Sequence, residues 1–158
     1  IIDDNDTIEV FSEESYDSTV WYMKIGKKLN LNEILKEDII EVDILHDEKY
    51  VSVFYSNWDS MELRAIIDVN GNVIFKGFNT IERYIPELDL FIIEINSNYI
   101  NEEAIAYYNL QSDTIYYTVI DSNGKLVMDF NTNYVRFEDG LFYVNRKEYT
   151  LKELTENL

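Results

Sequence analysis

The chain has 158 residues, and its 31 Asp or Glu against 13 Lys or Arg give a formal net charge of −18 at pH 7. A field of this sign repels nucleic acids and anionic lipids and attracts cations or basic proteins, so we expect no nucleic-acid partner. There is no Cys, which excludes disulfides, thiolate metal sites and a Cys nucleophile. No apolar run approaches the roughly 20 residues that a transmembrane helix requires.

The N-terminal segment is the most acidic part of the chain. Residues 1–18 carry seven Asp or Glu and no Lys or Arg, which predicts a weakly ordered lead-in. Within it, Ile8, Val10 and Phe11 could still add a short edge strand. Residues 19–25 (TVWYMKI) are apolar and predict the first regular strand.

The next segment predicts two further strands. Gly26-Lys27-Lys28 is typical of a turn, and the chain then forms either a short return strand or a helical turn over residues 31–37. Residues 39–45 alternate between apolar and polar side chains with a period of two, as a half-buried strand does. A polar turn at 46–49 leads into a strand over 50–55.

The clearest hairpin follows. Residues 62–68 and 72–76 predict two strands joined by the turn Asp68-Val69-Asn70-Gly71. Asn-Gly between apolar runs is a strong hairpin signal, because Gly adopts positive φ without steric cost. Residues 80–85 and 89–95 predict another strand pair.

The segment 101–110 (NEEAIAYYNL) is ambiguous. Asn101 could cap a helix with two Glu in its first turn, or the apolar run could form a strand that pairs with residues 114–120. We favour the strand. A second Asn-Gly turn at 121–124 and a strand at 141–144 follow.

The C-terminus predicts a short helix over residues 150–158. Thr150 and Glu153 have the spacing of a capping box, in which each side chain bonds the other residue's backbone N–H. Leu151, Leu154 and Leu158 fall on one face of this helix.

One segment occurs twice. Residues 65–95 and 118–145 both contain an apolar strand, an Ile-Asp-x-Asn-Gly turn, a second apolar strand, Phe-Asn-Thr and a Phe-centred strand. We predict an all-β fold of antiparallel β-hairpin repeats, as an open stack or a propeller-like arc with a short C-terminal helix. The predicted single domain, residues 19–158, would comprise three units, at about 19–60, 61–96 and 97–149, of which the first is a degenerate copy of the repeat.

The repeat resembles the WG-repeat family of bacterial β-hairpin repeats, which contain Ile-Asp-x-x-Gly-x-Val-Ile and later Phe-x-x-Gly-Leu. The residues that match are Ile67, Asp68, Gly71, Val73 and Ile74 in one copy, and Ile120, Asp121, Gly124, Leu126, Val127, Phe137, Gly140 and Leu141 in the other. The Trp-Gly pair that names the family is absent, so the chain resembles a divergent member. The resemblance implies repeated hairpins and a binding or structural role, with no catalytic motif.

Three functions remain open. The leading interpretation is a non-catalytic interaction module, exported or at the bacterial cell surface. The chain starts at Ile1 and not at Met, from which we expect that an upstream segment was removed by processing or by design. The alternatives are an acidic inhibitor or immunity-type protein that binds a basic partner, and a carbohydrate-binding or hydrolytic module that uses aromatic side chains and paired carboxylates.

We assign no catalytic, cofactor-binding or metal-binding residues. Asp68-Asn70 and Asp121-Asn123 offer oxygen ligands for calcium, but Gly follows too early for an EF-hand loop, and Asx turns explain both pairs. Asp3-Asp4-Asn5-Asp6 is a better oxygen cluster, interpreted as a solvated tail. His46, the only His, is assigned to an exposed turn.

Aromatic side chains are the remaining candidates for a binding surface. The residues are Trp21, Trp58, Tyr107, Tyr108, Tyr116 and Tyr117. Adjacent Tyr pairs in a strand place one ring on each face, so we expect one ring of each pair to be exposed. Exposed rings can bind sugars or proteins, whereas sheet surfaces also carry such rings without function. Trp58, in a polar loop, is the first candidate for mutation.

Overall fold

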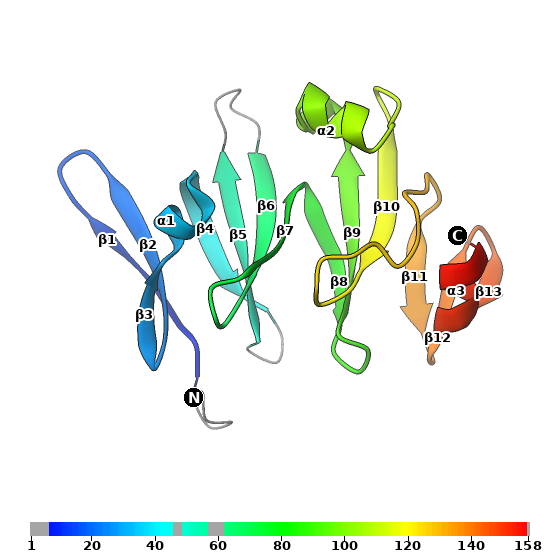
Figure 1. Cartoon of the computed structure of the whole chain (residues 1–158), viewed down its shortest axis with the longest axis horizontal. Coiled ribbons are helices and arrows are strands. Elements are labelled where there is room, and N and C mark those ends of the chain that lie inside the picture. The colour runs from blue at the N-terminus through cyan, green and yellow to red at the C-terminus, as the bar shows by residue number, and fades with distance from the viewer. Residues whose placement is uncertain (1–6, 46–48, 57–61, 158) are drawn as a thin grey trace. The chain divides into compact units, whose positions relative to one another are not determined.

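The fold is mainly β. The computed structural model describes residues 7–45, 49–56 and 62–157 (Figure 1). In these residues, thirteen strands form four antiparallel sheets, accompanied by three short α-helices, one of them at the C-terminus. The predicted all-β class with a closing helix is therefore confirmed.

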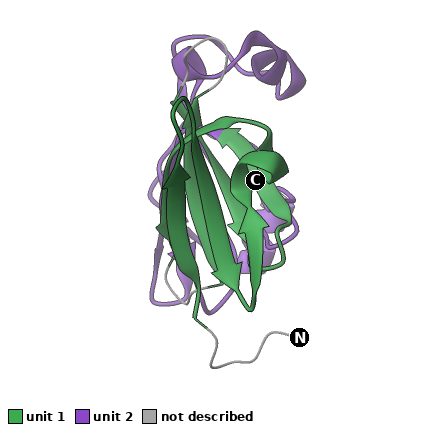
Figure 2. Ribbon diagram, turned by 90° about the vertical axis from the view of Figure 1, so that its left-hand side faces the viewer, with its two compact units in different colours: residues 1–77 green, residues 78–158 purple. Residues whose placement is uncertain are grey.

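The chain divides into two compact units, residues 1–77 and 78–158 (Figure 2). The first unit holds a three-stranded sheet and a four-stranded sheet, each with its strands in chain order. The three-stranded sheet consists of β1 (Glu9–Glu14), β2 (Thr19–Ile25) and β3 (Lys27–Asn30). The four-stranded sheet consists of β4 (Asp38–Ile44), β5 (Tyr50–Ser56), β6 (Glu62–Asp68) and β7 (Val73–Phe78).

The acidic lead-in contributes an edge strand to the first sheet. β1 pairs with β2 from Glu9 opposite Lys24 to Glu14 opposite Thr19. Ile8 is buried, and the ring of Phe11 stacks on that of Tyr22 with centroids 5.4 Å apart. Apolar contacts therefore hold this strand despite its charge.

Both alternatives for the chain after Gly26 occur in succession. β3 forms the return strand, and a helical turn, α1 (Leu31–Leu35), follows at once. Asn30 caps α1 by accepting a hydrogen bond from the Glu33 N–H, and Leu31 and Leu35 are buried. The helix ends where Lys36 adopts a left-handed conformation, with φ of 59°.

The second unit holds two three-stranded sheets. The first consists of β8 (Thr80–Ile85), β9 (Leu90–Asn96) and β10 (Ile115–Ile120), and the second of β11 (Val135–Glu138), β12 (Leu141–Val144) and β13 (Lys147–Tyr149). The helical segments are a 3₁₀ turn, η1 (Ser97–Tyr99), and the helices α2 (Glu102–Tyr107) and α3 (Leu151–Asn157).

One hydrophobic core joins these two sheets and α3. The buried members are Ile85, Leu90, Ile92, Val119, Met128, Val135, Phe137, Phe142, Val144 and Leu154. The predicted capping box starts α3: the Glu153 N–H donates to Thr150 Oγ1, and the Thr150 N–H donates to Glu153 Oε1, both at 3.2 Å. The cap thus places Leu154 over the core, where it is fully buried.

The two copies of the repeat form the same turn. The Gly71 N–H donates to the Asp68 carbonyl at 3.1 Å, and the Gly124 N–H donates to the Asp121 carbonyl at 3.0 Å. The chain closes each hairpin with a bond from the Asp N–H to the carbonyl four residues later, that of Asn72 or Lys125. The equivalence inferred from the sequence therefore extends to the backbone hydrogen bonds.

Each repeat runs across two sheets. The copy at 65–95 starts in β6 and ends in β9, and the copy at 118–145 starts in β10 and ends in β12. Each copy therefore supplies the end of one sheet and the first two strands of the next. Each copy of the repeated sequence thus connects one antiparallel sheet to the next sheet along the chain.

Two sequence predictions need correction. Residues 101–110 were expected to form a strand that pairs with residues 114–120, but they hold α2. The expected partner, β10, pairs with β9 on one side and bridges to Leu126 and Asn131 on the other, so neither of its edges is left for this segment. The expected return strand after Gly124 is reduced to two isolated bridges, Ile120 with Leu126 and Tyr117 with Asn131. Between them the chain bulges, and the Met128 carbonyl accepts a hydrogen bond from Thr118 Oγ1 at 2.6 Å.

Candidate functional site

Several of the basic side chains lie over aromatic rings of the protein itself. Lys28 Nζ lies 4.1 Å from the Tyr22 ring centroid and 2.9 Å from Glu13 Oε1. Further cations, each with the ring that it covers, are Arg64 over Phe54, Lys76 over Tyr55, Arg83 over Phe137 and Arg136 over Tyr143. The side chains of Lys28, Lys76 and Arg136 remain about half exposed, so the negative net charge comes from the number of acidic residues.

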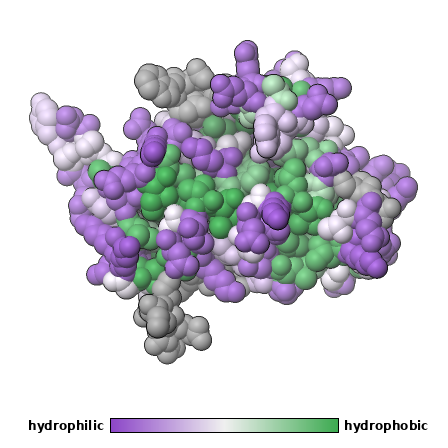
Figure 3. Space-filling model, in the orientation of Figure 1, coloured by the Kyte–Doolittle hydropathy of each residue, from purple (hydrophilic) through white to green (hydrophobic). Residues whose placement is uncertain are grey.

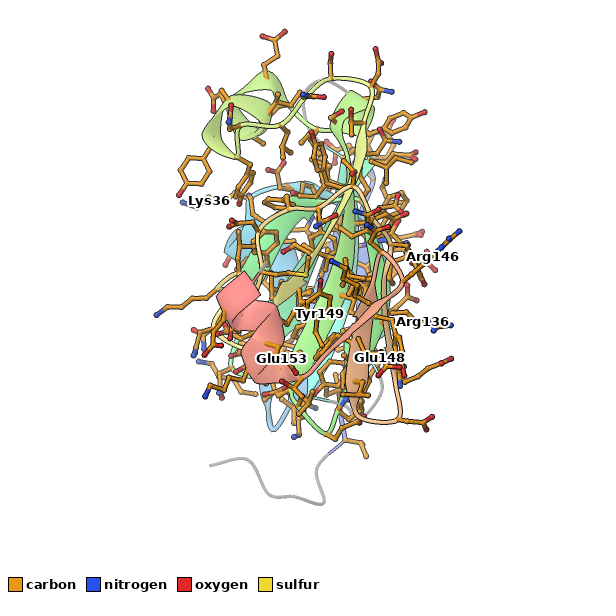
Figure 4. The ribbon with its side chains drawn as sticks, turned by 90° about the vertical axis from the view of Figure 1, so that its right-hand side faces the viewer. Lys36, Arg136, Arg146, Glu148, Tyr149 and Glu153 are labelled. Carbon is orange, nitrogen blue, oxygen red and sulfur yellow. The ribbon has the colours of Figure 1, made fainter. Side chains whose placement is uncertain are left out.

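Most described carboxylates are indeed on the surface. The exposed ones include Glu9, Glu13, Glu14, Asp17, Glu33, Asp38, Glu41, Asp43, Glu102, Glu103, Asp113 and Asp129. Cations are exposed too in both units, and Arg136 and Arg146 point outward from the last sheet (Figure 4). They are outnumbered, because the chain has 13 Lys or Arg against 31 Asp or Glu. The net charge of −18 is therefore distributed over the surface instead of being neutralised by ion pairs.

One acidic pocket lies in the first unit, at the β1–β2 hairpin. It has a volume of about 710 Å³ and is lined by Glu14, Ser15, Tyr16, Asp17, Ser18, Thr19, Asp38 and Ile39. The Ser15 N–H donates to the Ser18 carbonyl at 2.8 Å, which closes the hairpin turn. Tyr16 is fully exposed. Three carboxylates and an exposed aromatic ring give this pocket the chemistry to bind a cation.

A pair of carboxyl groups lies on the sheet of the second unit. The β8–β9 register shifts between Ile81 and Arg83, so Glu82 is the extra residue of a β-bulge. A bulge redirects a side chain, and here Glu82 and Glu94 form a side-chain hydrogen bond. Burial, and then this bond and the charge of Glu82, raise the pKa of Glu94 above its ordinary 4.5.

Two tyrosines adjoin this carboxyl pair. Tyr117 lies opposite Glu94 in the β9–β10 ladder, and its ring meets that of Tyr134 edge-on at 5.3 Å. Burial raises the pKa of Tyr117, and the charges of Glu94 and Glu82 add to that effect. A retaining glycosidase holds its two carboxyl groups about 5 Å apart, whereas these two share a hydrogen bond.

The aromatic pair at 107–108 lies on α2. Tyr107 is 81% exposed, and its ring meets that of Tyr108 edge-on at 4.9 Å. Tyr108 in turn meets Phe130, which lies in the bulged segment after the second Asn-Gly turn, at 4.7 Å. Burial raises the pKa of Tyr108, with a smaller contribution from Tyr107. These three rings form a continuous aromatic cluster on the second unit.

The predicted site residues do not form one surface. Tyr116 is buried, and its hydroxyl accepts a hydrogen bond from the Gln111 N–H at 2.8 Å, so it serves the structure. Tyr117 is half-buried beside Glu94, and Tyr107 is exposed on α2. Trp21 is half-buried in β2. Trp58 and His46, like residues 1–6 with their Asp cluster, lie outside the described residues.

The Asn-Gly turns use their carboxylates internally. Asp68 Oδ1 accepts hydrogen bonds from the Asn70 and Asn72 N–H groups, at 3.0 and 2.8 Å. Asp121 Oδ1 accepts from the Asn123 and Lys125 N–H groups, both at 2.9 Å. These are Asx turns, as the spacing predicts. Among the described residues, no group of three or more His, Cys, Asp or Glu side chains could hold a metal ion.

Two features of these surfaces were missed by sequence reasoning. The Glu82–Glu94 contact depends on a bulge, for which the strand TIERYI carries no distinct signal. Tyr16 was not singled out, although it lies in an acidic hairpin between β1 and β2 and is fully exposed. A polar turn with an isolated aromatic residue was the signal that could have identified it.

Comparisons with known proteins identify no relative. No protein-family model matches the chain. No curated protein and no solved structure matches it either. In the described part of the chain, none of the helices has the length and apolar character to cross a membrane.

Proposed function

We propose that this protein is a non-catalytic binding module whose partner is a basic protein. The observation that carries the proposal is the excess of acidic over basic residues, 31 against 13, together with the exposure of most of the described carboxylates. Such a surface raises the association rate with a basic partner through electrostatic steering. The acidic pocket at the β1–β2 hairpin and the aromatic cluster on α2 supply places where that partner could be held.

The proposal includes a distant relationship to WG-repeat proteins. Its support is the pair of Ile-Asp-x-Asn-Gly turns, which share the same backbone and Asx hydrogen bonds. Repeats of this kind serve as scaffolds in which each unit buries its apolar face against its neighbours. A scaffold with a highly charged exterior fits a role in protein binding.

The test is the affinity for a fluorescein-labelled nonapeptide of arginine, measured by fluorescence anisotropy. Nonaglutamate and a neutral Gly-Ser peptide are the controls. We expect binding of the arginine peptide alone at about 0.1 M salt and its loss at about 1 M, where the screening length falls from about 10 Å to about 3 Å. Absence of binding at low salt, or binding that is insensitive to salt, would contradict the proposal.

A further inference from the structure

We propose that the exposed face of α2, with Glu103, Tyr107, Tyr108 and Phe130, is the surface that receives an arginine side chain of the basic partner. This inference rests on the proposed function and assigns it a location. The surface is called the α2 face below. It lies on the second unit, at the connection between β9 and β10 (Figure 1).

The α2 helix is formed by local interactions and leaves its surface free. Asn101 Oδ1 accepts a hydrogen bond from the Ala104 N–H at 2.8 Å, which starts the helix, and Tyr108 ends it. None of the residues of α2 is buried. A six-residue helix with no buried side chain contributes little to the core. Its position in the fold is therefore compatible with a role in contact with another molecule.

The aromatic cluster gives this face a preformed shape. Tyr107 contacts Tyr108, and Tyr108 contacts Phe130 across the chain, so the three rings support one another. Tyr108 and Phe130 are half-buried, whereas Tyr107 is 81% exposed. An exposed ring that contacts an anchored ring loses less conformational freedom when a ligand stacks on it.

The chain on either side of α2 carries acidic side chains and no basic ones. From Tyr84 to Gly124 the sequence contains no Lys or Arg, and this stretch includes β9, α2 and β10. Glu102, Glu103, Asp113 and Asp129 are all exposed. In Figure 3 the atoms at the α2 end of the second unit are mostly purple or pale, whereas those over the sheet below it are largely green. Charge complementarity therefore selects a cationic occupant.

Arginine fits both chemical features at once. Glu103 and Tyr107 lie four positions apart in α2, which places their side chains on one face of the helix. A guanidinium group stacks on an aromatic ring and donates two parallel hydrogen bonds to a carboxylate. A carboxylate one helical turn from an exposed ring is thus an arrangement that an arginine side chain can engage at both ends.

The test compares matched variants in the anisotropy assay with the arginine nonapeptide. Tyr107→Ala should weaken binding roughly two- to fivefold, the effect expected of an exposed cation–π contact. Tyr107→Phe keeps the ring face and should bind within about twofold of the wild type. Glu103→Gln should also weaken binding. Tyr134→Ala removes a tyrosine that is 54% exposed outside the α2 face, and it should leave the affinity unchanged. Tyr16→Ala tests the acidic pocket of the first unit as the competing site, and it should weaken binding less than Tyr107→Ala does.

The outcomes separate this inference from the proposed function. If the wild type binds the peptide in a salt-dependent manner but Tyr107→Ala binds equally well, the α2 face is not the site, and the proposed function stands. The α2 face is also ruled out if Tyr16→Ala weakens binding more than Tyr107→Ala does. If the wild type fails to bind at low salt, both are wrong. Because Tyr107 is exposed, circular dichroism should show the variant to be folded.

Discussion

The aspartates of the two Asn-Gly turns offer the sharpest test of the repeat. The N–H groups of Asn123 and Lys125 both donate to Asp121 Oδ1 at 2.9 Å, and Asp121→Ala removes this shared acceptor. Hydrogen bonds to charged groups contribute about 1.5–3 kcal/mol each, and solvent competes at an exposed turn. We therefore expect a loss of about 1–2 kcal/mol for the pair, which lowers the melting temperature by about 2–8 °C.

The equivalent variant in the other copy should behave alike. Asp68→Ala removes the same two bonds, and in addition the contact from Asn72 Nδ2 to Asp68 Oδ2 at 3.1 Å, so its loss should be equal or slightly larger. Asp68→Asn and Asp121→Asn keep an oxygen acceptor and should cost less than the Ala variants. Urea unfolding followed by circular dichroism measures all four.

Calcium binding is the alternative role for the carboxylates of Asp68 and Asp121. A site with millimolar affinity would stabilise the wild type by about 1 kcal/mol in about 5 mM calcium. Since both carboxylates already accept backbone N–H groups, we expect calcium and a chelator to leave the melting temperature unchanged. Stabilisation by calcium that disappears in Asp121→Ala, or a neutral effect of both Ala variants, would refute the Asx-turn account.

Three further predictions concern stability. Because the folded-state pKa of Glu94 is raised, the free energy of unfolding of the wild type, measured with urea, should fall as pH rises from 4.5 through that pKa. Glu94→Gln should abolish this decline and should be more stable than the wild type at pH 7. Glu87→Gln, at an exposed control site, should keep the decline. Gly71→Ala should lower the free energy of unfolding by about 1 kcal/mol or more, because φ is +86° and the new Cβ would lie 3.3 Å from side-chain atoms of Ile34 and Leu29. Gly77→Ala, where φ is +88° and the space is open, should lower it less. Equal shifts in melting temperature for the two variants would contradict the packing argument. Phe142→Ala should cost about 3–5 kcal/mol, because this ring is fully buried in the core of the second unit, and calorimetry showing less than about 1 kcal/mol would contradict that core.

Local chemistry made the two Asn-Gly turns and the C-terminal helix predictable. Asp68 and Asp121 fix their turns through bonds to residues two and four positions later, and Thr150 fixes the start of α3 through Glu153. The segment 101–110 was mispredicted because its apolar run suits a strand. Its state is decided by whether β10 has a free edge for it, and β9 and the bridges to Leu126 and Asn131 occupy both edges. Pairing of distant strands is not encoded in a local pattern.

The candidate surfaces were less predictable for the same reason. Tyr107 and Tyr108 were identified as candidates, but the expectation that one ring of the pair is exposed assumed a strand. The ring that completes their cluster, Phe130, lies more than twenty residues away in the sequence. The carboxyl pair needs both the bulge at Glu82 and the β8–β9 register. The charge excess, in contrast, follows from composition alone, and it is the feature that carries the functional proposal.

The most direct test of a basic partner held at the α2 face is an NMR titration of the ¹⁵N-labelled protein with the arginine nonapeptide. We predict that the amide shifts of residues 101–113 and 128–131 change most, that they saturate, and that high salt reverses them. Shifts spread evenly over both units, or concentrated at residues 14–19 of the β1–β2 hairpin, would contradict the α2 face. An unchanged spectrum at low salt would contradict the basic partner altogether.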